Sequence, residues 1–191
     1  PRQETEFLID FALKKVENLK FGRWADLGTG SGPLAISLAK SLPNWKGHAV
    51  DISKDALQLA KRNLRSLAPN SNVKLSLGDW WEPLQKWWGS FDLVLSNPPY
   101  IPSDLIGELE SVVKNHEPRI ALDGGSDGMS ASKQIIIGSL NGLAKGGWLI
   151  LEHHYDQSDK VINFMKDIGM ESVSFEKDLN GIKRYAICRK K

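Results

Sequence analysis

Short apolar runs of strand length alternate with amphipathic segments along the chain. The pattern predicts strands over residues 23–27, 47–51, 72–77, 91–96, 148–154, 171–176 and 183–188. It predicts helices over residues 3–18, 33–42, 53–67, 104–114, 130–144 and 158–168. Because strands that alternate with helices form a parallel sheet covered on both faces, we expect an α/β domain with a mostly parallel sheet.

The end of the chain departs from this alternation. Asn180 and Gly181 predict a tight turn between the last two strands, which should therefore pair antiparallel. The expected fold is a seven-stranded Rossmann-like sheet with an antiparallel C-terminal hairpin. Since no linker, repeat or low-complexity segment interrupts the pattern, we expect one domain over residues 1–191. Ligands of such sheets bind at the carboxyl ends of the strands, so the loops after the first four strands are the expected site.

Composition narrows the class of protein. Of the 191 residues, 41% are hydrophobic and 25% charged, and no apolar run has the length of a membrane span. The net charge of +2 gives little electrostatic support for a nucleic-acid partner. Cys188 has no cysteine partner in the chain and stands in an apolar alternation, which indicates a buried structural thiol and a cytoplasmic protein.

A glycine loop follows the first predicted strand. It comprises Gly28, Thr29, Gly30, Ser31 and Gly32 and leads into a helix. Glycines at this point let a ligand lie directly against backbone N–H groups. The residue after Gly32, where a dinucleotide fingerprint has its third glycine, is Pro33, which disfavours a nicotinamide cofactor.

Acidic residues end the next two strands. Asp51 lies about 20 residues after the glycine loop, where a carboxylate can accept hydrogen bonds from both ribose hydroxyls; capping of the following helix near Ser53 is its alternative role. Asp79 and Trp80 can hydrogen-bond and cover an adenine ring. For Trp81, Trp87 and Trp88 the sequence favours packing over ligand contact. These residues predict an adenosine pocket that S-adenosyl-L-methionine would fit.

The fourth strand stops at Asn97, Pro98, Pro99 and Tyr100. The Asn97 side chain and the Pro98 carbonyl can accept both N–H groups of one planar NH2, and the prolines restrict the backbone geometry. Tyr100 can lie against the flat face of the same group. Two acceptors would aim the nitrogen at a sulfonium methyl and stabilise the positive charge that develops on it. The loop predicts a carboxamide or an exocyclic base amine as the methyl acceptor.

The segments around this loop distinguish between the two acceptors. The sequences "PRQETE", "DLGTGSG", "VDIS", "GDWWEPL", "SNPPYI", "HEPRIALDGGSDGM" and "GGWLILEHH" together resemble the catalytic domain of peptide chain release factor glutamine methyltransferases, the PrmC or HemK family. The resemblance implies transfer of a methyl group from S-adenosyl-L-methionine, leaving S-adenosyl-L-homocysteine, to the glutamine amide N5 in the Gly-Gly-Gln motif of class 1 release factors. It also implies a cytoplasmic enzyme, which we expect to be a monomer without a membrane or direct nucleic-acid partner.

The resemblance also assigns residues. It places cofactor contacts at Gly28, Thr29, Gly30, Ser31, Gly32, Asp51, Ile52, Asp79, Trp80 and Asn97. It places glutamine contacts at Asn97, Pro98, Pro99 and Tyr100, with Asn97, Pro98 and Tyr100 in the catalytic role. Glu117 is a further substrate-side candidate, ahead of Asp123 and Asp127. His116, His153 and His154 show no metal-ligand spacing, so no metal site is expected.

Three departures from the family pattern stand out. Gln3 replaces a usual proline, His154 replaces the glycine of "EHG", and the family's amino-terminal helical domain is absent from this sequence. Without that domain we expect cofactor binding but weakened methylation of an intact release factor. The alternatives are an adenine N6-methyltransferase acting on RNA or DNA, a non-catalytic adenosyl-binding module, and a nicotinamide oxidoreductase.

Overall fold

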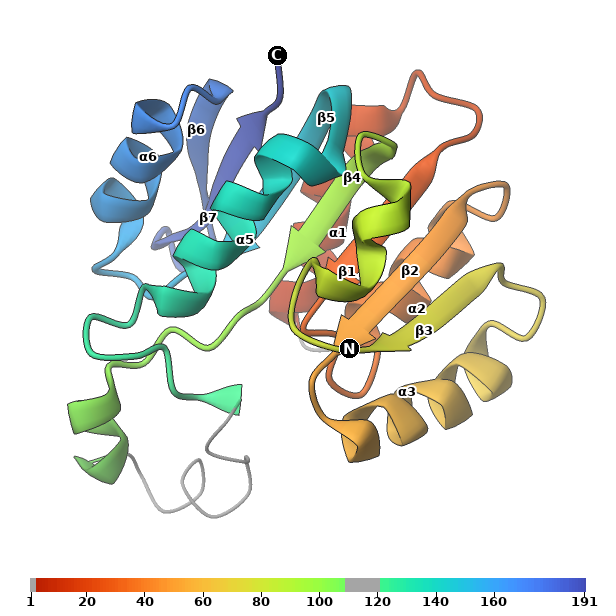
Figure 1. The fold of residues 1–191 in the computed structure, drawn as a ribbon, viewed down its shortest axis with the longest axis horizontal. Coiled ribbons are helices and arrows are strands. Elements are labelled where there is room, and N and C mark those ends of the chain that lie inside the picture. The colour runs from red at the N-terminus through yellow and green to blue at the C-terminus, as the bar shows by residue number, and fades with distance from the viewer. Residues whose placement is uncertain (1–2, 109–120) are drawn as a thin grey trace.

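Seven strands form one mixed sheet within residues 3–108 and 121–191, the residues that the computed structural model describes. The strands are β1 (Arg23–Leu27), β2 (Lys46–Asp51), β3 (Val73–Leu77), β4 (Phe91–Ser96), β5 (Leu143–Glu152), β6 (Glu171–Lys177) and β7 (Lys183–Arg189). Their order in the sheet is β3-β2-β1-β4-β5-β7-β6 (Figure 1). The first five strands run parallel, and β7 pairs antiparallel with both β5 and β6. The expected fold class is confirmed.

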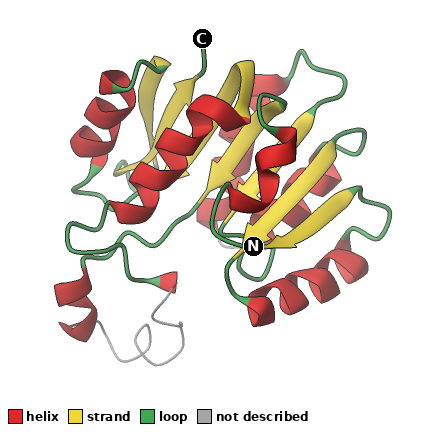
Figure 2. Cartoon of the chain, in the orientation of Figure 1, coloured by secondary structure: helices red, strands yellow, loops and turns green. Residues whose placement is uncertain are grey.

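Helices cover both faces of the sheet, as Figure 2 shows. They are α1 (Gln3–Val16), α2 (Pro33–Ser41), α3 (Lys54–Leu67), α5 (Ser130–Gly142) and α6 (Ser158–Asp167), with two short 3-10 helices, η1 (Glu82–Trp87) and η2 (Ser103–Glu108). Side chains alternate between the faces. In β1, Trp24 joins the core beneath α1 and α2, whereas the neighbouring Ala25 joins the core beneath α5 and α6. Two apolar layers therefore hold the sheet in place.

Trp81 packs inside the molecule, as the sequence predicts. It is buried, and its indole Nε1 donates a hydrogen bond to the carbonyl oxygen of Ile135 in α5 at 2.9 Å. Gly138 and Gly142 present α5 to the indole, because a Cβ at either position would collide with the ring. Trp87 packs on His48 with ring centroids 4.3 Å apart, while Trp88 is 43% exposed.

Two elements differ from the sequence prediction by more than two residues at a boundary. β5 begins at Leu143 rather than near Trp148, because Leu143 pairs with Phe91 and Gly146 and Gly147 bond to Lys190 beside the end of β7. The expected turn at residues 145–147 is thus an irregularity inside a strand. The described part of the helix expected at residues 104–114 is the 3-10 helix η2, and the remainder lies outside the described residues.

Gly169, Gly181 and Cys188 agree with expectation. Gly169 has φ 86° after α6, the left-handed conformation typical of a helix C-terminus, and Gly181 has φ 77° in the turn before β7. Cys188 is fully buried, and burial raises the pKa of its thiol to about 12. No helix within residues 3–108 and 121–191 is long and apolar enough to cross a membrane.

Candidate active site

The loop after β1 is shaped by a buried carboxylate. Gly28 and Gly30 have φ 78° and 56°, and the N–H groups of Gly28 and Thr29 both donate to the Val50 carbonyl at 2.9 Å. Asp26 lies fully buried beneath the loop, where its Oδ2 accepts from Thr29 Oγ1 at 2.7 Å and from the Ala35 N–H at 3.2 Å. Asp26 therefore joins the glycine loop to the start of α2.

The environment of Asp26 changes its acidity. Burial raises the pKa of its carboxyl to about 7, against the hydrogen bonds from Thr29 and Ala35, which lower it, and Asp51 adds a smaller upward contribution. A carboxyl with this pKa is partly protonated near neutral pH. The motif "DLGTGSG" includes Asp26, but the sequence alone does not show that this carboxylate connects the glycine loop to α2. The hydrogen bonds from Thr29 and Ala35 show it.

The glycines of the loop have different surroundings. At Gly30 a Cβ would meet no atom within 4 Å, so the backbone there is open to a ligand. At Gly28 a Cβ would lie 3.0 Å from the Trp80 ring, and Trp80 itself has φ 40°, so the indole lies against the glycine loop. At Gly32, with φ 90°, a Cβ would lie 3.3 Å from Ala60 Cβ, which indicates close packing of α2 on α3.

Asp51 connects the loops after β1 and β2. Its Oδ2 accepts from the Gly30 N–H and its Oδ1 from the Ser53 N–H, both at 2.8 Å. The hydroxyl of Ser53 caps α3 by accepting from the Ala56 N–H at 3.2 Å, so helix capping falls to Ser53 rather than to Asp51. Each carboxylate oxygen of Asp51 has a further lone pair available for a ligand hydroxyl.

A cavity of about 980 Å³ lies along the carboxyl ends of the first four strands and reaches the start of α5. The predicted cofactor residues that line it are Gly28, Gly30, Ser31, Asp51, Ile52, Asp79, Trp80 and Asn97. Thr29 and Gly32 do not line it, because Thr29 bonds to Asp26 and Gly32 packs on α3. Within the cavity, burial and then the nearby Glu82 raise the pKa of Asp79.

A second cavity, of about 450 Å³, lies on the other side of the loop after β4. Its lining includes all of Asn97, Pro98, Pro99 and Tyr100, together with Glu152 and Arg184 from β5 and β7. The two cavities share Gly28, Gly30 and Ser31 of the glycine loop, together with Asn97, Pro99 and Ala121. Asn97 thus stands where a nucleoside-sized cavity and a smaller cavity meet.

The sheet places Asn97 beside the glycine loop. Leu27 at the end of β1 pairs with Ser96 at the end of β4, and Ser96 Oγ donates to the Leu27 carbonyl at 2.6 Å. The residues that follow each strand, Gly28 and Asn97, therefore begin at the same edge of the sheet. Beyond Pro99, the Tyr100 carbonyl accepts from Gln157 Nε2, a contact that no sequence motif indicates.

The remaining acidic candidates have different surroundings. Asp123 lines the larger cavity and accepts from Ser103 Oγ at 2.6 Å and the Gly125 N–H at 3.0 Å. Asp127 accepts from Lys133 Nζ at 2.7 Å, and the hydrogen bonds from Lys133 and the Met129 N–H lower the pKa of its carboxyl. It lines neither cavity. Glu117 lies outside the described residues.

The structure describes two of the three histidines that were considered as metal ligands. His153 and His154 follow β5, and His116 lies outside the described residues. Within residues 3–108 and 121–191 no group of three or more His, Cys, Asp or Glu side chains is placed to hold a metal ion.

Glu152 also belongs to the candidate site, although the sequence analysis did not single it out. It ends β5 and lines the smaller cavity. A carboxylate at the end of a strand is the same signal that indicated Asp51.

Comparison with known sequences identifies related proteins. Residues 4–168 match the family model described as the methyltransferase small domain. The release factor glutamine methyltransferase of Prochlorococcus marinus is 57% identical over 98% of this chain and 64% of its own length. That of Coxiella burnetii is 39% identical over 100% of this chain and 66% of its own length. The chain thus spans slightly less than two thirds of these relatives, and the resemblance seen in its motifs is confirmed.

Solved structures share the fold at low sequence identity. The catalytic domain of hMettl16 in complex with MAT2A 3'UTR hairpin 1 matches with a TM-score of 0.72 at 16% identity, over 97% of this chain and 69% of that one. A ribosomal protein L11 methylase from Lactobacillus delbrueckii subsp. bulgaricus matches with a TM-score of 0.66 at 21% identity, over 97% and 80%. These similarities support the fold, and the identities are too low to transfer a substrate.

Proposed function

This chain belongs to the methyltransferase small domain family, and from that premise we propose that it is the catalytic portion of a release factor glutamine methyltransferase. The acceptor is the side-chain amide nitrogen of the glutamine in the Gly-Gly-Gln motif of class 1 peptide chain release factors. The observation that carries the proposal is the junction at Asn97 between two cavities, one of nucleoside size and one lined by the whole Asn97–Tyr100 loop. The 57% identity to a protein named for this activity supports the substrate.

The larger cavity fits S-adenosyl-L-methionine. The open backbone at Gly30, where a Cβ would occupy free space, suits a ligand that lies against the loop, and the cavity of about 980 Å³ is within the size range of cofactor sites. Asp51 would accept from the ribose hydroxyls through lone pairs that Gly30 and Ser53 leave free. Asp79 and Trp80 would hold and cover the adenine, with Ile52 at the exposed rim.

The bound cofactor supplies an electrophilic methyl group on a sulfonium and leaves as S-adenosyl-L-homocysteine. The chain's own residues orient the acceptor. The Asn97 side-chain oxygen and the Pro98 carbonyl accept the two N–H groups of the glutamine amide, which points the nitrogen lone pair toward the larger cavity. The same two acceptors stabilise the positive charge on nitrogen, so its proton can leave to solvent after the transfer.

Tyr100 and the prolines define the shape of the acceptor site. Pro98 and Pro99 have no N–H group, so their backbone offers acceptors without donors that would compete for the substrate carbonyl. Tyr100 is half-buried in the wall of the smaller cavity, where its ring can lie against the flat amide. A planar carboxamide matches this combination of two acceptors and one aromatic face.

The same proposal covers the setting of the enzyme. We expect residues 1–191 to act as one methyltransferase domain, as a monomer in the cytoplasm, with release factors as protein partners and without a metal ion. The buried, high-pKa thiol of Cys188 suits a reducing compartment, because it has neither a cysteine partner nor access to solvent.

A labelling experiment tests the activity. The full-length protein is incubated with cofactor labelled in the methyl group and, separately, with a class 1 release factor, duplex DNA and RNA. We expect label on the release factor only, and none when its motif glutamine is replaced. Label on adenine in DNA or RNA with an unlabelled release factor would support the alternative, an adenine N6-methyltransferase.

A further inference from the structure

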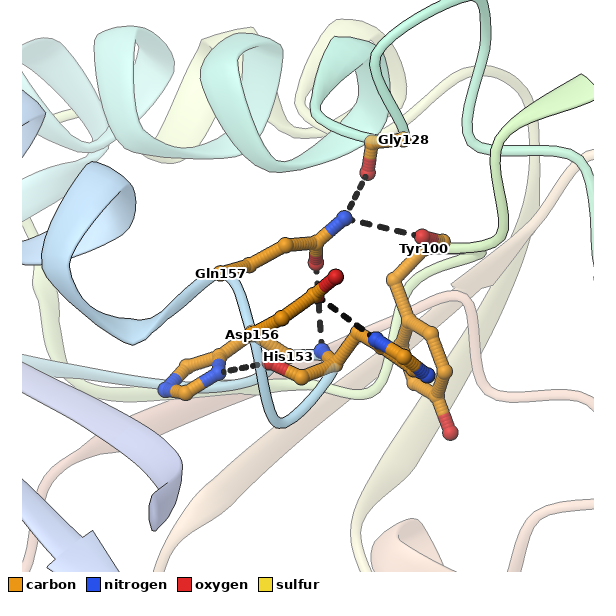
Figure 3. A network of polar contacts seen from close by, with 6 residues as sticks. Tyr100, Gly128, His153, Asp156 and Gln157 are labelled. Carbon is orange, nitrogen blue, oxygen red and sulfur yellow. Dashed lines mark hydrogen bonds and ion pairs between the residues drawn. The ribbon is translucent and has the colours of Figure 1, made fainter.

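Three segments that are distant in the sequence meet around Gln157, as Figure 3 shows. Gln157 stands before α6 and is 3% exposed. Its Nε2 donates to the Tyr100 carbonyl at 2.9 Å and to the Gly128 carbonyl at 3.2 Å. Its Oε1 accepts from the His154 N–H at 3.1 Å. One buried amide therefore links the acceptor loop, the loop before α5 and the loop after β5.

The loop before α5 is shaped to admit this amide. Gly128 has φ 68°, and a Cβ at that position would lie 2.5 Å from both Gln157 Nε2 and the Tyr100 carbonyl oxygen. Any residue larger than glycine would push the three segments apart. The acceptor loop and the loop before α5 also form backbone hydrogen bonds. The Ile101 N–H donates to the Leu122 carbonyl at 3.0 Å, and the Gly124 N–H donates to the Ile101 carbonyl at 2.8 Å.

The acceptor loop depends on such contacts for its orientation. The β4 ladder ends at Ser96, and residues 97–100 belong to no strand or helix. Pro98 and Pro99 cannot donate backbone hydrogen bonds, so the middle of this stretch is fixed through carbonyls and by packing. Gln157 holds the carbonyl of Tyr100, the residue that follows the two prolines.

We propose that Gln157 is a positioning residue of the acceptor site. Its NH2 group fixes the Tyr100 and Gly128 carbonyls, and this contact holds Asn97, Pro98 and the Tyr100 ring in the orientation that receives the acceptor amide. The inference rests on the proposed function. It assigns to the start of α6 a part in acceptor recognition, although Gln157 lines neither cavity.

The Gln157→Glu variant isolates the donor role. A carboxylate keeps the oxygen that accepts from His154 and nearly the same volume, but it places an unprotonated oxygen against two carbonyl oxygens. The Tyr100 and Gly128 carbonyls then lose their donor and the acceptor loop loses its fixed orientation, so kcat/KM for the acceptor should fall by roughly 10- to 100-fold. Cofactor affinity, measured by titration calorimetry, should change less than about twofold because the larger cavity is untouched.

The pH dependence of the variant tests whether the missing donor causes its loss of activity. A buried carboxyl facing two carbonyl oxygens has a raised pKa, and once protonated it can donate one hydrogen bond. The activity of Gln157→Glu relative to the natural chain should therefore recover as the pH is lowered. Ser139→Ala is the matched control, since it removes a buried hydrogen bond within α5, from Ser139 Oγ to the Ile136 carbonyl, that lies outside both cavities.

Amide hydrogen exchange tests the same inference without any substrate. In Gln157→Glu the amides of Ile101 and Gly124 should exchange about 10-fold faster, while those of β1 and β4 stay unchanged. Unaltered exchange at Ile101 and Gly124, or an unaltered kcat/KM for the acceptor, would overturn the positioning role. Failure of the natural protein to methylate any release factor would instead contradict the proposed function, and the exchange result would still decide the role of Gln157.

Discussion

Asn97 borders both cavities and follows directly after the buried strand β4. A side chain at such a junction can influence the transferred group and the acceptor together. The sequence indicated this position because an apolar run ends abruptly at an amide and two prolines. It could not indicate that the smaller cavity would also receive Glu152 and Arg184, which come from distant strands.

The Asn97→Ala variant separates aiming from binding. Removal of the side-chain acceptor should lower kcat by roughly 100-fold or more, because the nitrogen loses both its orientation and the stabilisation of its developing charge. Cofactor affinity should fall by less than about threefold, since Asp51, Asp79 and Trp80 remain. Single-turnover rates and calorimetric titration measure the two quantities. Equal losses in both would contradict the aiming role.

His48 predicts a pH effect on stability at a site remote from the chemistry. It is buried with its ring against Trp87, and burial, followed by Arg23, Lys74 and Lys86, lowers its pKa to about 4. The folded state thus keeps His48 neutral while the unfolded chain takes up a proton below about pH 6.5. This contribution to stability is present at neutral pH and is lost as the pH falls toward 4. From about pH 7 to about pH 5 the loss is about 2 kcal/mol.

The test compares the natural chain with His48→Phe by urea unfolding at the two pH values. The free energy of unfolding should fall less on acidification in the variant, which cannot bind that proton. The comparison between chains is needed because Asp26, with its pKa raised to about 7, has the opposite effect and favours the folded state as the pH falls. Equal pH dependence in both chains would show that His48 titrates normally when folded.

Among the elements, α5 shows how a loop residue is anchored. Trp81 follows the loop of Asp79 and Trp80, and its indole inserts against Gly138 and Gly142 of α5. This packing holds the loop of Asp79 and Trp80, which lines the larger cavity, against α5, whose first residues line the same cavity. The packing that the sequence predicts for Trp81 is confirmed, and the two glycines four residues apart explain how a full indole fits next to a helix.

The Gly138→Ala variant has opposing effects that can be weighed. In an ordinary helix the change would stabilise the fold by about 1 kcal/mol. Here the added methyl collides with the Trp81 ring, and overpacking of a filled core costs about 1–3 kcal/mol, so we expect net destabilisation. Asn141→Ala, at an exposed position of α5, serves as the control and should be neutral or slightly stabilising. Thermal unfolding of both variants distinguishes the cases, and a more stable Gly138→Ala chain would contradict the packing.

Element boundaries were predictable where a strong local signal ended them. β1 and β4 begin and end as the sequence predicts, because the glycine loop and the Asn97–Tyr100 stretch interrupt apolar runs. The start of β5 was not predictable. Gly146 and Gly147 are typical of a turn, and only their hydrogen bonds to Lys190, near the end of the chain, make them part of a strand. The sequence did not indicate the role of Gln157 either, because Gln157 and Tyr100 are far apart in the chain and only the sheet order brings them together.

At the scale of the whole molecule, the parallel strands β1 to β4 end at one edge of the sheet (Figure 1). The loops that follow these strands line the larger cavity, and Asn97 lines both cavities. The larger cavity provides a nucleoside-sized site, and the smaller cavity combines the acceptors and the aromatic ring of the Asn97–Tyr100 loop with Glu152 and Arg184. The proposal of a protein substrate rests on the similarity to release factor glutamine methyltransferases, of which the chain spans slightly less than two thirds.

Tandem mass spectrometry of a release factor after treatment with the full-length protein and S-adenosyl-L-methionine tests the central claim most directly. The account predicts one added methyl group on the side-chain amide of the motif glutamine, and no addition with the Asn97→Ala variant. A methyl group on any other residue, or an unmodified release factor under conditions in which the protein binds the cofactor, would contradict it.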